Sequence, residues 1–166
     1  LYTIEVRHQQ AQAEYFRTRS PTGPIVRPLV FQPTIEPGAG ALVVIFVERG
    51  AVHLVFNDEV HPIAGINEAY RTLRARQYGR TRDVESLEVL EGDLAYFPGS
   101  GAGRSNVYET NIHVYTSEPF TGSVFSQTWN HLLSSHGSPM IELRGGYRVA
   151  SAPIMYGGRA EAEQYS

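Results

Sequence analysis

The length, composition and charge of this chain suit one folded domain and argue against several classes of protein. It has 166 residues, of which 42% are hydrophobic and 19% are charged. This is enough apolar material for a core and too much for a disordered chain. The formal net charge of −3 gives no overall attraction to nucleic acid, and no apolar run reaches the roughly 18 residues of a membrane helix. We therefore expect neither a membrane nor nucleic acid as a partner.

Lysine and cysteine are absent from the chain. All fourteen basic residues are arginine. Arginine forms planar bidentate contacts and is enriched in interfaces where lysine is depleted, although a GC-rich coding sequence gives the same bias. The absence of cysteine excludes disulfides and thiolate chemistry. The chain begins at Leu1 without a signal-peptide pattern, so we expect a trimmed start, with a virion or the cytoplasm as its location.

The first part of the chain is predicted to be extended. Residues 2–7 alternate apolar and polar side chains, as a half-exposed strand does. The polar residues that follow predict a surface arm over about 1–20. Five prolines between Pro21 and Pro37 suit edge strands and loops better than a central strand.

Two buried strands and one helix are predicted in the middle of the chain. Residues 42–47 are a continuous β-branched and aromatic run, and residues 52–56 follow it as a second mainly apolar run, so both are predicted to be buried strands. A turn should follow, with residues 60–63 as the return strand of a hairpin. An Asn cap and good helix formers then predict a short surface helix over 67–77.

The second half is predicted to continue as short strands and to end in a tail. From Pro153 the residues are rich in Gly, Ala and Tyr, with too little apolar surface to fold alone, so we expect a frayed tail over about 153–166. About eight short strands with regular turns are typical of a sandwich or barrel. The strand patterns lie at 87–90, 94–97, 111–115 and 124–129, with weaker ones at 140–143 and 147–149.

The segment from Gly92 to Gly99 resembles the second motif of the cupin family. A Gly-Asp turn starts a strand that ends at Pro98 and is followed by a glycine-containing loop, and the run around His53 is similar to the preceding cupin hairpin. The resemblance covers roughly 42–115. It implies a single all-β domain over 1–166, a cupin-like or jelly-roll sandwich or barrel with one short inserted helix. Viral coat jelly rolls share this double-sheet architecture.

The cupin metal ligands are missing from the matching positions. Metal-binding cupins resemble one another in a His-x-His pair and a later His, whereas here His53 lies between Val52 and Leu54. Residues 101–104 read Gly-Ala-Gly-Arg where the later His is expected. Because metal ligands must converge on the ion, we predict no metal and no other cofactor. The barrel pocket that the resemblance implies is assigned to His53, Tyr96, His113 and Tyr115.

Two further groups of residues are interpreted as structural, and no catalytic residue is predicted. His131 and His136 flank two serines, but no nucleophile elbow frames either serine, and the histidines are not at the i, i+4 spacing of a zinc motif. We expect polar loop residues there. The glycine-rich loop at 99–104 lacks the Lys-Ser/Thr of a P-loop.

Two sets of residues are predicted to contact other subunits. Arginines cluster on the predicted helix, where they form either a solvated basic face or a dock for an acidic partner. Aromatic and aliphatic residues near the C-terminus have little core of their own and suit anchors against a neighbour. The candidate interface residues are Arg71, Arg74, Tyr147, Ile154, Met155 and Tyr156.

Three functions remain open from the sequence. The favoured one is a non-enzymatic assembly subunit of the viral capsid or surface type, which binds copies of itself and other coat subunits. The second is a metal-free cupin that binds a small ligand, like a sensor domain. The third is a cofactor-free isomerase or epimerase in which His53 or His113 and a tyrosine perform acid/base catalysis.

Overall fold

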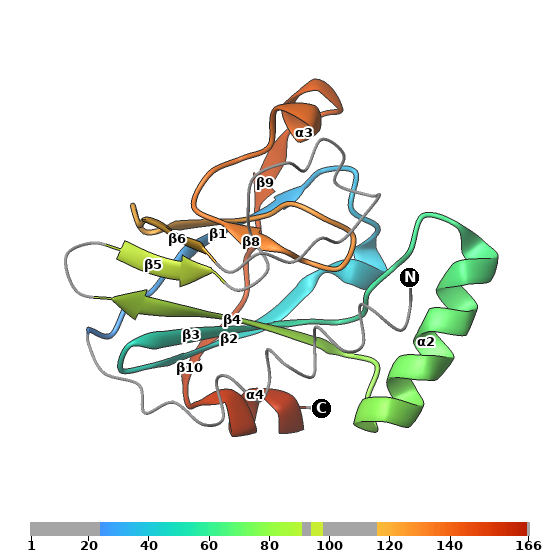
Figure 1. Cartoon of the computed structure of the whole chain (residues 1–166), viewed down its shortest axis with the longest axis horizontal. Coiled ribbons are helices and arrows are strands. Elements are labelled where there is room, and N and C mark those ends of the chain that lie inside the picture. Colours follow the sequence, from blue (N-terminus) through green and yellow to red (C-terminus); the bar gives the residue numbers. More distant parts are fainter. Residues whose placement is uncertain (1–23, 91–93, 98–115, 166) are drawn as a thin grey trace.

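Two β-sheets packed face to face make up most of the protein (Figure 1). The computed structural model describes residues 24–90, 94–97 and 116–165. The predicted β-rich fold is confirmed. The four-stranded sheet contains, in order, β8 (Leu133–Ser134), β7 (Ser123–Ser126), β1 (Leu29–Pro33) and β9 (Tyr147–Val149). The six-stranded sheet contains, in order, β10 (Ile154–Tyr156), β2 (Leu42–Glu48), β3 (Ala51–Phe56), β4 (Asp83–Leu90), β5 (Leu94–Phe97) and β6 (Thr116–Pro119).

Short helices lie at the periphery of the sheets. The helix predicted over 67–77 is confirmed as α2 (Ala64–Tyr78), which ends at Gly79 with a left-handed φ of 70° that suits glycine. The weak strand predicted at 140–143 is wrong, because Pro139 begins the helix α3 (Pro139–Leu143). The described residues also contain α4 (Arg159–Gln164) and a 3₁₀ turn, η1 (Gly38–Gly40), so they hold more than the one helix expected.

The main hydrophobic core lies between the two sheets, and a smaller cluster lies on the outer face of the six-stranded sheet. Side chains alternate along β3, so Leu54 and Phe56 belong to the main core and Val55 to the outer cluster. α4 covers the outer cluster through Ala162. Because both faces of β2 and β3 are covered, apolar residues occupy both faces of each strand, interrupted by His53 in β3 and ending before Glu48 in β2.

The C-terminal residues are part of the fold. β10 pairs in parallel with β2, and α4 packs on the same sheet with Ala162 buried. Tyr165 meets Phe46 edge to face, with ring centroids 5.8 Å apart. The expected tail over 153–166 is therefore wrong for the described residues up to 165. A short segment with little apolar surface is ordered here because β2 offers it both an edge and an apolar face.

The hairpin expected after β3 is also wrong. Residues 60–63 form no strand and lead into α2, and the second neighbour of β3 is β4, which pairs with it in antiparallel register. Two pairs of strands, β1 with β7 and β10 with β2, are parallel, so both sheets are mixed.

Several sequence expectations lie outside the described residues. These are the surface arm over 1–20, the strands over 2–7 and 111–115, and half of the cupin-like segment from Gly92 to Gly99, whose described part, 94–97, is strand β5 as expected. Within the described ranges, no helix is long and apolar enough to cross a membrane.

Candidate functional site

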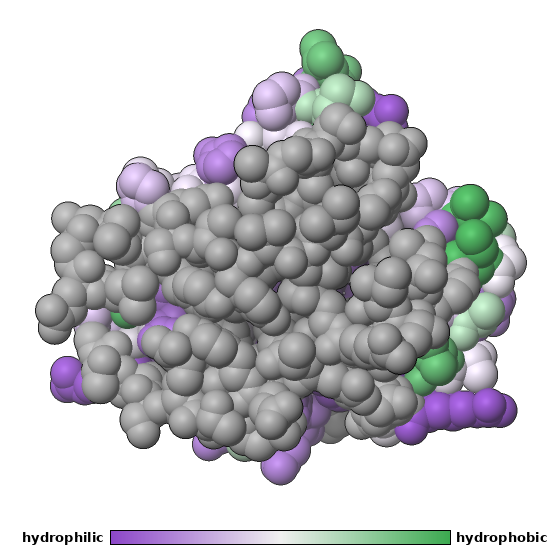
Figure 2. Space-filling model, in the orientation of Figure 1, coloured by the Kyte–Doolittle hydropathy of each residue, from purple (hydrophilic) through white to green (hydrophobic). Residues whose placement is uncertain are grey.

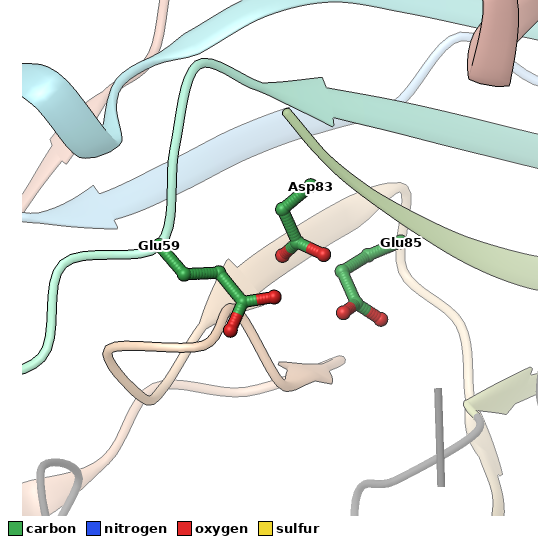
Figure 3. Close-up of side chains that lie close together, drawn as sticks. All are labelled: Glu59, Asp83 and Glu85. Carbon is green, nitrogen blue, oxygen red and sulfur yellow. The ribbon is translucent and has the colours of Figure 1, made fainter. Parts of the chain in front are cut away.

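Three carboxylates converge between the sheets (Figure 3). Glu59 lies just after β3, and Asp83 and Glu85 lie on β4, two residues apart and therefore on the same face of the strand. Carboxylate oxygens of the three residues lie within 4.8 Å of one another, and all three residues are buried. We call Glu59, Asp83 and Glu85 the acidic cluster.

His131 supplies a positive charge to the acidic cluster. Its Nδ1 lies 2.9 Å from Oδ2 of Asp83, and its Nε2 lies 3.0 Å from Oε1 of Glu36. Burial by itself lowers the pKa of His131, but the charges and hydrogen bonds of Glu36 and Asp83 outweigh it and raise the pKa to about 10. The imidazole is therefore a cation at neutral pH, with both N–H groups donated to carboxylates.

The backbone and ring of His131 are also constrained. Its φ of 60° is left-handed, which is unusual for a residue other than glycine. Its ring stacks on Phe56 with centroids 3.8 Å apart. Strained backbone persists only where the surroundings impose it, so the two carboxylates and Phe56 hold His131 in place.

The pKa values of the Glu59 and Asp83 carboxyl groups are shifted in opposite directions. Burial and the nearby charge of Asp83 raise the pKa of Glu59 well above its usual range. Burial has the same tendency at Asp83, but the hydrogen bond and charge of His131 lower its pKa overall. The environment therefore favours the protonated form of Glu59 and the ionised form of Asp83, as expected for carboxyl groups that cannot both ionise at close range.

Arg74 connects α2 to the residues beside the acidic cluster. Its side chain is 2% exposed and pairs with Asp58, and its guanidinium also donates to the carbonyl oxygen of Glu59 at 3.3 Å. Arg71 is about half exposed, with its Nε 2.9 Å from Oδ2 of Asp58. The expected interface role of Arg74 is wrong, because burial makes its side chain inaccessible to a partner. Arg71 remains exposed, although it has an ion pair within its own chain.

The acidic cluster has the oxygen donors that Ca²⁺ or Mg²⁺ prefers. In this fold, however, His131 and Arg74 already provide positive charge beside it. These two cations offset part of the negative charge of the cluster, and the ion pair between His131 and Asp83 links the two sheets.

The sequence did not predict the acidic cluster or its partner His131. Glu59 lies in a segment that is typical of a turn, and His131 lies in a segment that is typical of a polar loop. The available signal was the i, i+2 acidic pair Asp83 and Glu85, which continues the alternation of the apolar Leu87 and Val89.

A second buried network surrounds His53. Its Nδ1 lies 2.7 Å from Oγ of Ser86 and its Nε2 lies 2.6 Å from Oε2 of Glu48, while Arg159 of α4 donates to the same Ser86 oxygen at 2.8 Å. Burial lowers the pKa of His53, although the hydrogen bond to Glu48 opposes this effect. Ser86 is 1% exposed and lies beneath α4, so this serine, histidine and glutamate form a satisfied structural cluster.

The predicted barrel pocket is not assembled in the described residues. His53 points to the face covered by α4, not into the space between the sheets, because it alternates with Val52 and Leu54 of the main core. The side chain of Tyr96 and the whole of His113 and Tyr115 lie outside the described residues.

The remaining interface candidates lie on consecutive strands. Tyr147 on β9 is half-buried, packs edge to face on Phe125 with ring centroids 5.0 Å apart, and accepts a hydrogen bond from the backbone N–H of Ser138. Tyr147 therefore makes its contacts within its own chain. The side chains of β10 are 39% (Ile154), 45% (Met155) and 68% (Tyr156) exposed, and together with Arg71 they form the accessible part of the predicted set.

No family model, curated protein or solved structure matches this chain. The functional argument therefore depends on the geometry of the chain itself. In that geometry both polar networks are buried, whereas β10 is accessible to other molecules.

Proposed function

We propose that this chain is a non-enzymatic subunit of a protein assembly and that it associates with copies of itself. The observation that carries the proposal is the edge strand β10, in which Ile154, Met155 and Tyr156 are all exposed and none is charged. An accessible apolar edge strand is a template for pairing with another chain, which natural monomers normally avoid.

The other sheet edges have features that oppose such pairing. β8 has only two residues. β6 contains Glu118 and ends at the exposed Pro119, and β9 contains the exposed Arg148. Short length, charge and proline are the usual protection of an edge strand. β10 contains neither a charge nor a proline, so it is the edge best suited to association.

Exposed apolar residues gather beside this edge. Nine large hydrophobic side chains are exposed in the described residues. Figure 2 shows apolar surface over α3 and beside α2, the elements to which the exposed Leu143 and Ile63 belong. Six others form what we call the apolar flank: Ile25, Leu29, Val149, Ile154, Met155 and Tyr156.

Three contacts hold the apolar flank together. Residues 150–153 link β9 directly to β10, and Val149 of β9 pairs with Phe31 of β1. Arg27 donates a hydrogen bond to the Tyr156 hydroxyl at 2.7 Å, which brings the segment before β1 alongside β10. These links place exposed apolar residues of β9, β10 and the segment before β1 in one region of the protein, and such groups mark a protein interaction site more often than scattered exposed residues do.

The layered architecture is also compatible with an assembly role. Double-sheet jelly rolls are common in viral coat proteins. We propose that this chain is a variant of that architecture, with the parallel pairs β1–β7 and β10–β2 as its departures from an antiparallel jelly roll. The partners are then further copies of the chain and, in a coat, other coat subunits.

Light scattering coupled to size exclusion tests the proposal. We expect the unmodified protein to be a dimer or larger, and Tyr156→Glu to weaken association by roughly 30-fold or more, because about 2 kcal/mol is typical of an interface anchor. Leu143→Glu is the matched control, since it changes an 83% exposed residue on α3 and should leave the oligomer intact. A protein that stays monomeric at every concentration, and is stabilised by small molecules, would favour the ligand-binding alternative.

A further inference from the structure

We infer that two copies of this chain join through antiparallel pairing of β10 with β10 of a partner subunit, about a twofold axis at Met155. The inference rests on the proposed self-association and specifies its geometry. Each six-stranded sheet then continues into that of the other copy.

The hydrogen bonds between β10 and β2 show which backbone groups remain on the open edge. The N–H of Ile45 donates to the carbonyl of Pro153, and the N–H of Gly157 donates to the carbonyl of Val47. Backbone groups alternate in direction along a strand, so Pro153, Met155 and Gly157 face β2. The N–H and C=O groups of Ile154 and Tyr156 therefore face away from β2, toward a potential partner strand.

This alternation selects one register for a symmetric pair. In an antiparallel ladder, hydrogen-bonded residues face each other directly and exchange two bonds. With Met155 on the twofold axis, Ile154 lies opposite the partner's Tyr156 and Tyr156 opposite the partner's Ile154, which gives four hydrogen bonds. Among the three residues of β10, an axis at Ile154 or at Tyr156 gives only one hydrogen-bonded pair, and hence two bonds. The register centred on Met155 satisfies the open edge best.

The side chains of β10 are complementary to themselves in this register. Ile154 and Tyr156 pair with Ile45 and Val47, which face the main core, so both point to that side of the sheet. Each copy then places an aliphatic side chain directly across from an aromatic one, which is a favourable cross-strand pair. Met155 points to the opposite side, with Phe46 as its neighbour on β2, and meets the partner's Met155.

The charge distribution also favours a second copy as the occupant. None of the three residues of β10 is charged, so the twofold axis brings no like charges face to face on the strand. Arg27, bound to the Tyr156 hydroxyl, lies beyond the centre of the pairing. β10 offers a charged peptide no residue of opposite charge. A second, uncharged copy of β10 needs no such residue.

The absence of cysteine allows a direct test. Residues at a non-hydrogen-bonded antiparallel position have Cα atoms about 4.5 Å apart, which is within the range of about 4.4 to 6.8 Å that a disulfide requires. We expect Met155→Cys to give a disulfide-linked dimer under mild oxidation, seen on a non-reducing gel. Ile154→Cys is the matched control on the same strand, because in this register the two copies of residue 154 are offset beyond disulfide reach. Leu143→Cys controls for random collision.

Crosslinking and light scattering together distinguish the two proposals. Faster crosslinking at residue 155 than at residues 154 and 143, in a protein that is dimeric before oxidation, supports the pairing. A dimeric protein in which residue 155 crosslinks no faster than residue 154 overturns this geometry but leaves self-association standing. A protein that is monomeric by light scattering and does not crosslink at residue 155 overturns both. Circular dichroism of each variant confirms that the fold is retained.

Discussion

The positive charge of His131 should contribute a large part of the stability of this domain. Replacing it with Asn removes the charge from between Glu36 and Asp83, both of which are buried. Asn is the suitable replacement because it tolerates the left-handed φ of 60° at this position better than other residues. The measured loss then contains the charge, its hydrogen bonds and the ring contact with Phe56, but not backbone strain, and only the part due to the charge depends on pH.

The magnitude follows from the pKa of His131. A pKa raised from the ordinary 6.5 to about 10 means that the folded state binds this proton more tightly than the unfolded state. The stabilisation is fully present below pH 6.5 and disappears as the pH rises through 10. At about 1.4 kcal/mol per tenfold change in proton affinity, it amounts to about 4 kcal/mol at pH 7 and about 1 kcal/mol at pH 9. Breaking a buried ion pair costs about 3–5 kcal/mol, which agrees.

Urea denaturation at a fixed protein concentration, repeated between pH 6 and pH 10, provides the measurement. We expect the free energies of unfolding of the unmodified protein and of His131→Asn to differ most at pH 6–7 and to converge toward pH 10. His136→Asn, which changes an exposed histidine five residues later, should alter the free energy by less than about 1 kcal/mol. A loss below about 1 kcal/mol for His131→Asn at pH 7, or a difference that does not change with pH, would refute this account.

Two further predictions concern stability. Glu59→Gln should cost less than about 1 kcal/mol, because burial and the charge of Asp83 raise the pKa of Glu59 and favour its neutral form, whereas Asp83→Asn should cost about 3–5 kcal/mol by removing the anion that pairs with His131; urea denaturation at pH 7 compares the two, and equal losses would contradict the opposite pKa shifts of the two carboxyl groups. Truncation after Pro153 should cost on the order of 3–6 kcal/mol, because it removes β10 and α4 and uncovers the outer cluster around Phe46. Thermal melting of the truncated chain checks this, and an unchanged melting temperature would show that the segment contributes little to the fold.

The elements that were predictable from the sequence are those whose signal is local. β2 and β3 are mainly apolar because both of their faces are covered, and the helix predicted over 67–77 has its expected cap and helix formers within its own residues. Such patterns require no knowledge of distant parts of the chain. The strand predicted at 140–143 failed because a short apolar stretch suits either type of element, and Pro139 favoured the helix.

The residues that were not predictable depend on partners far away in the sequence. His131 bonds to Asp83 and to Glu36, which are 48 and 95 positions away. A charged side chain on its own predicts exposure, and only the fold reveals that these charges are buried together. The C-terminal segment was misjudged for the same reason, because it is stabilised by the edge and outer face of β2 and not by its own composition.

The buried charges and the apolar flank are linked by the way the sheets are joined. Glu36 follows β1, and His131 lies in the connection between β7 and β8, so both belong to the connections of the four-stranded sheet. Asp83 lies on β4 of the six-stranded sheet. The ion pairs of His131 therefore tie one sheet to the other. The edge strand β9 pairs with β1, and the edge strand β10 pairs with β2. The relative position of the two sheets therefore fixes the position of β9 relative to β10. Hydrophobic packing alone tolerates sliding between sheets, whereas directional ion pairs at fixed positions do not. The buried network thus determines the shape of the surface that we propose for assembly.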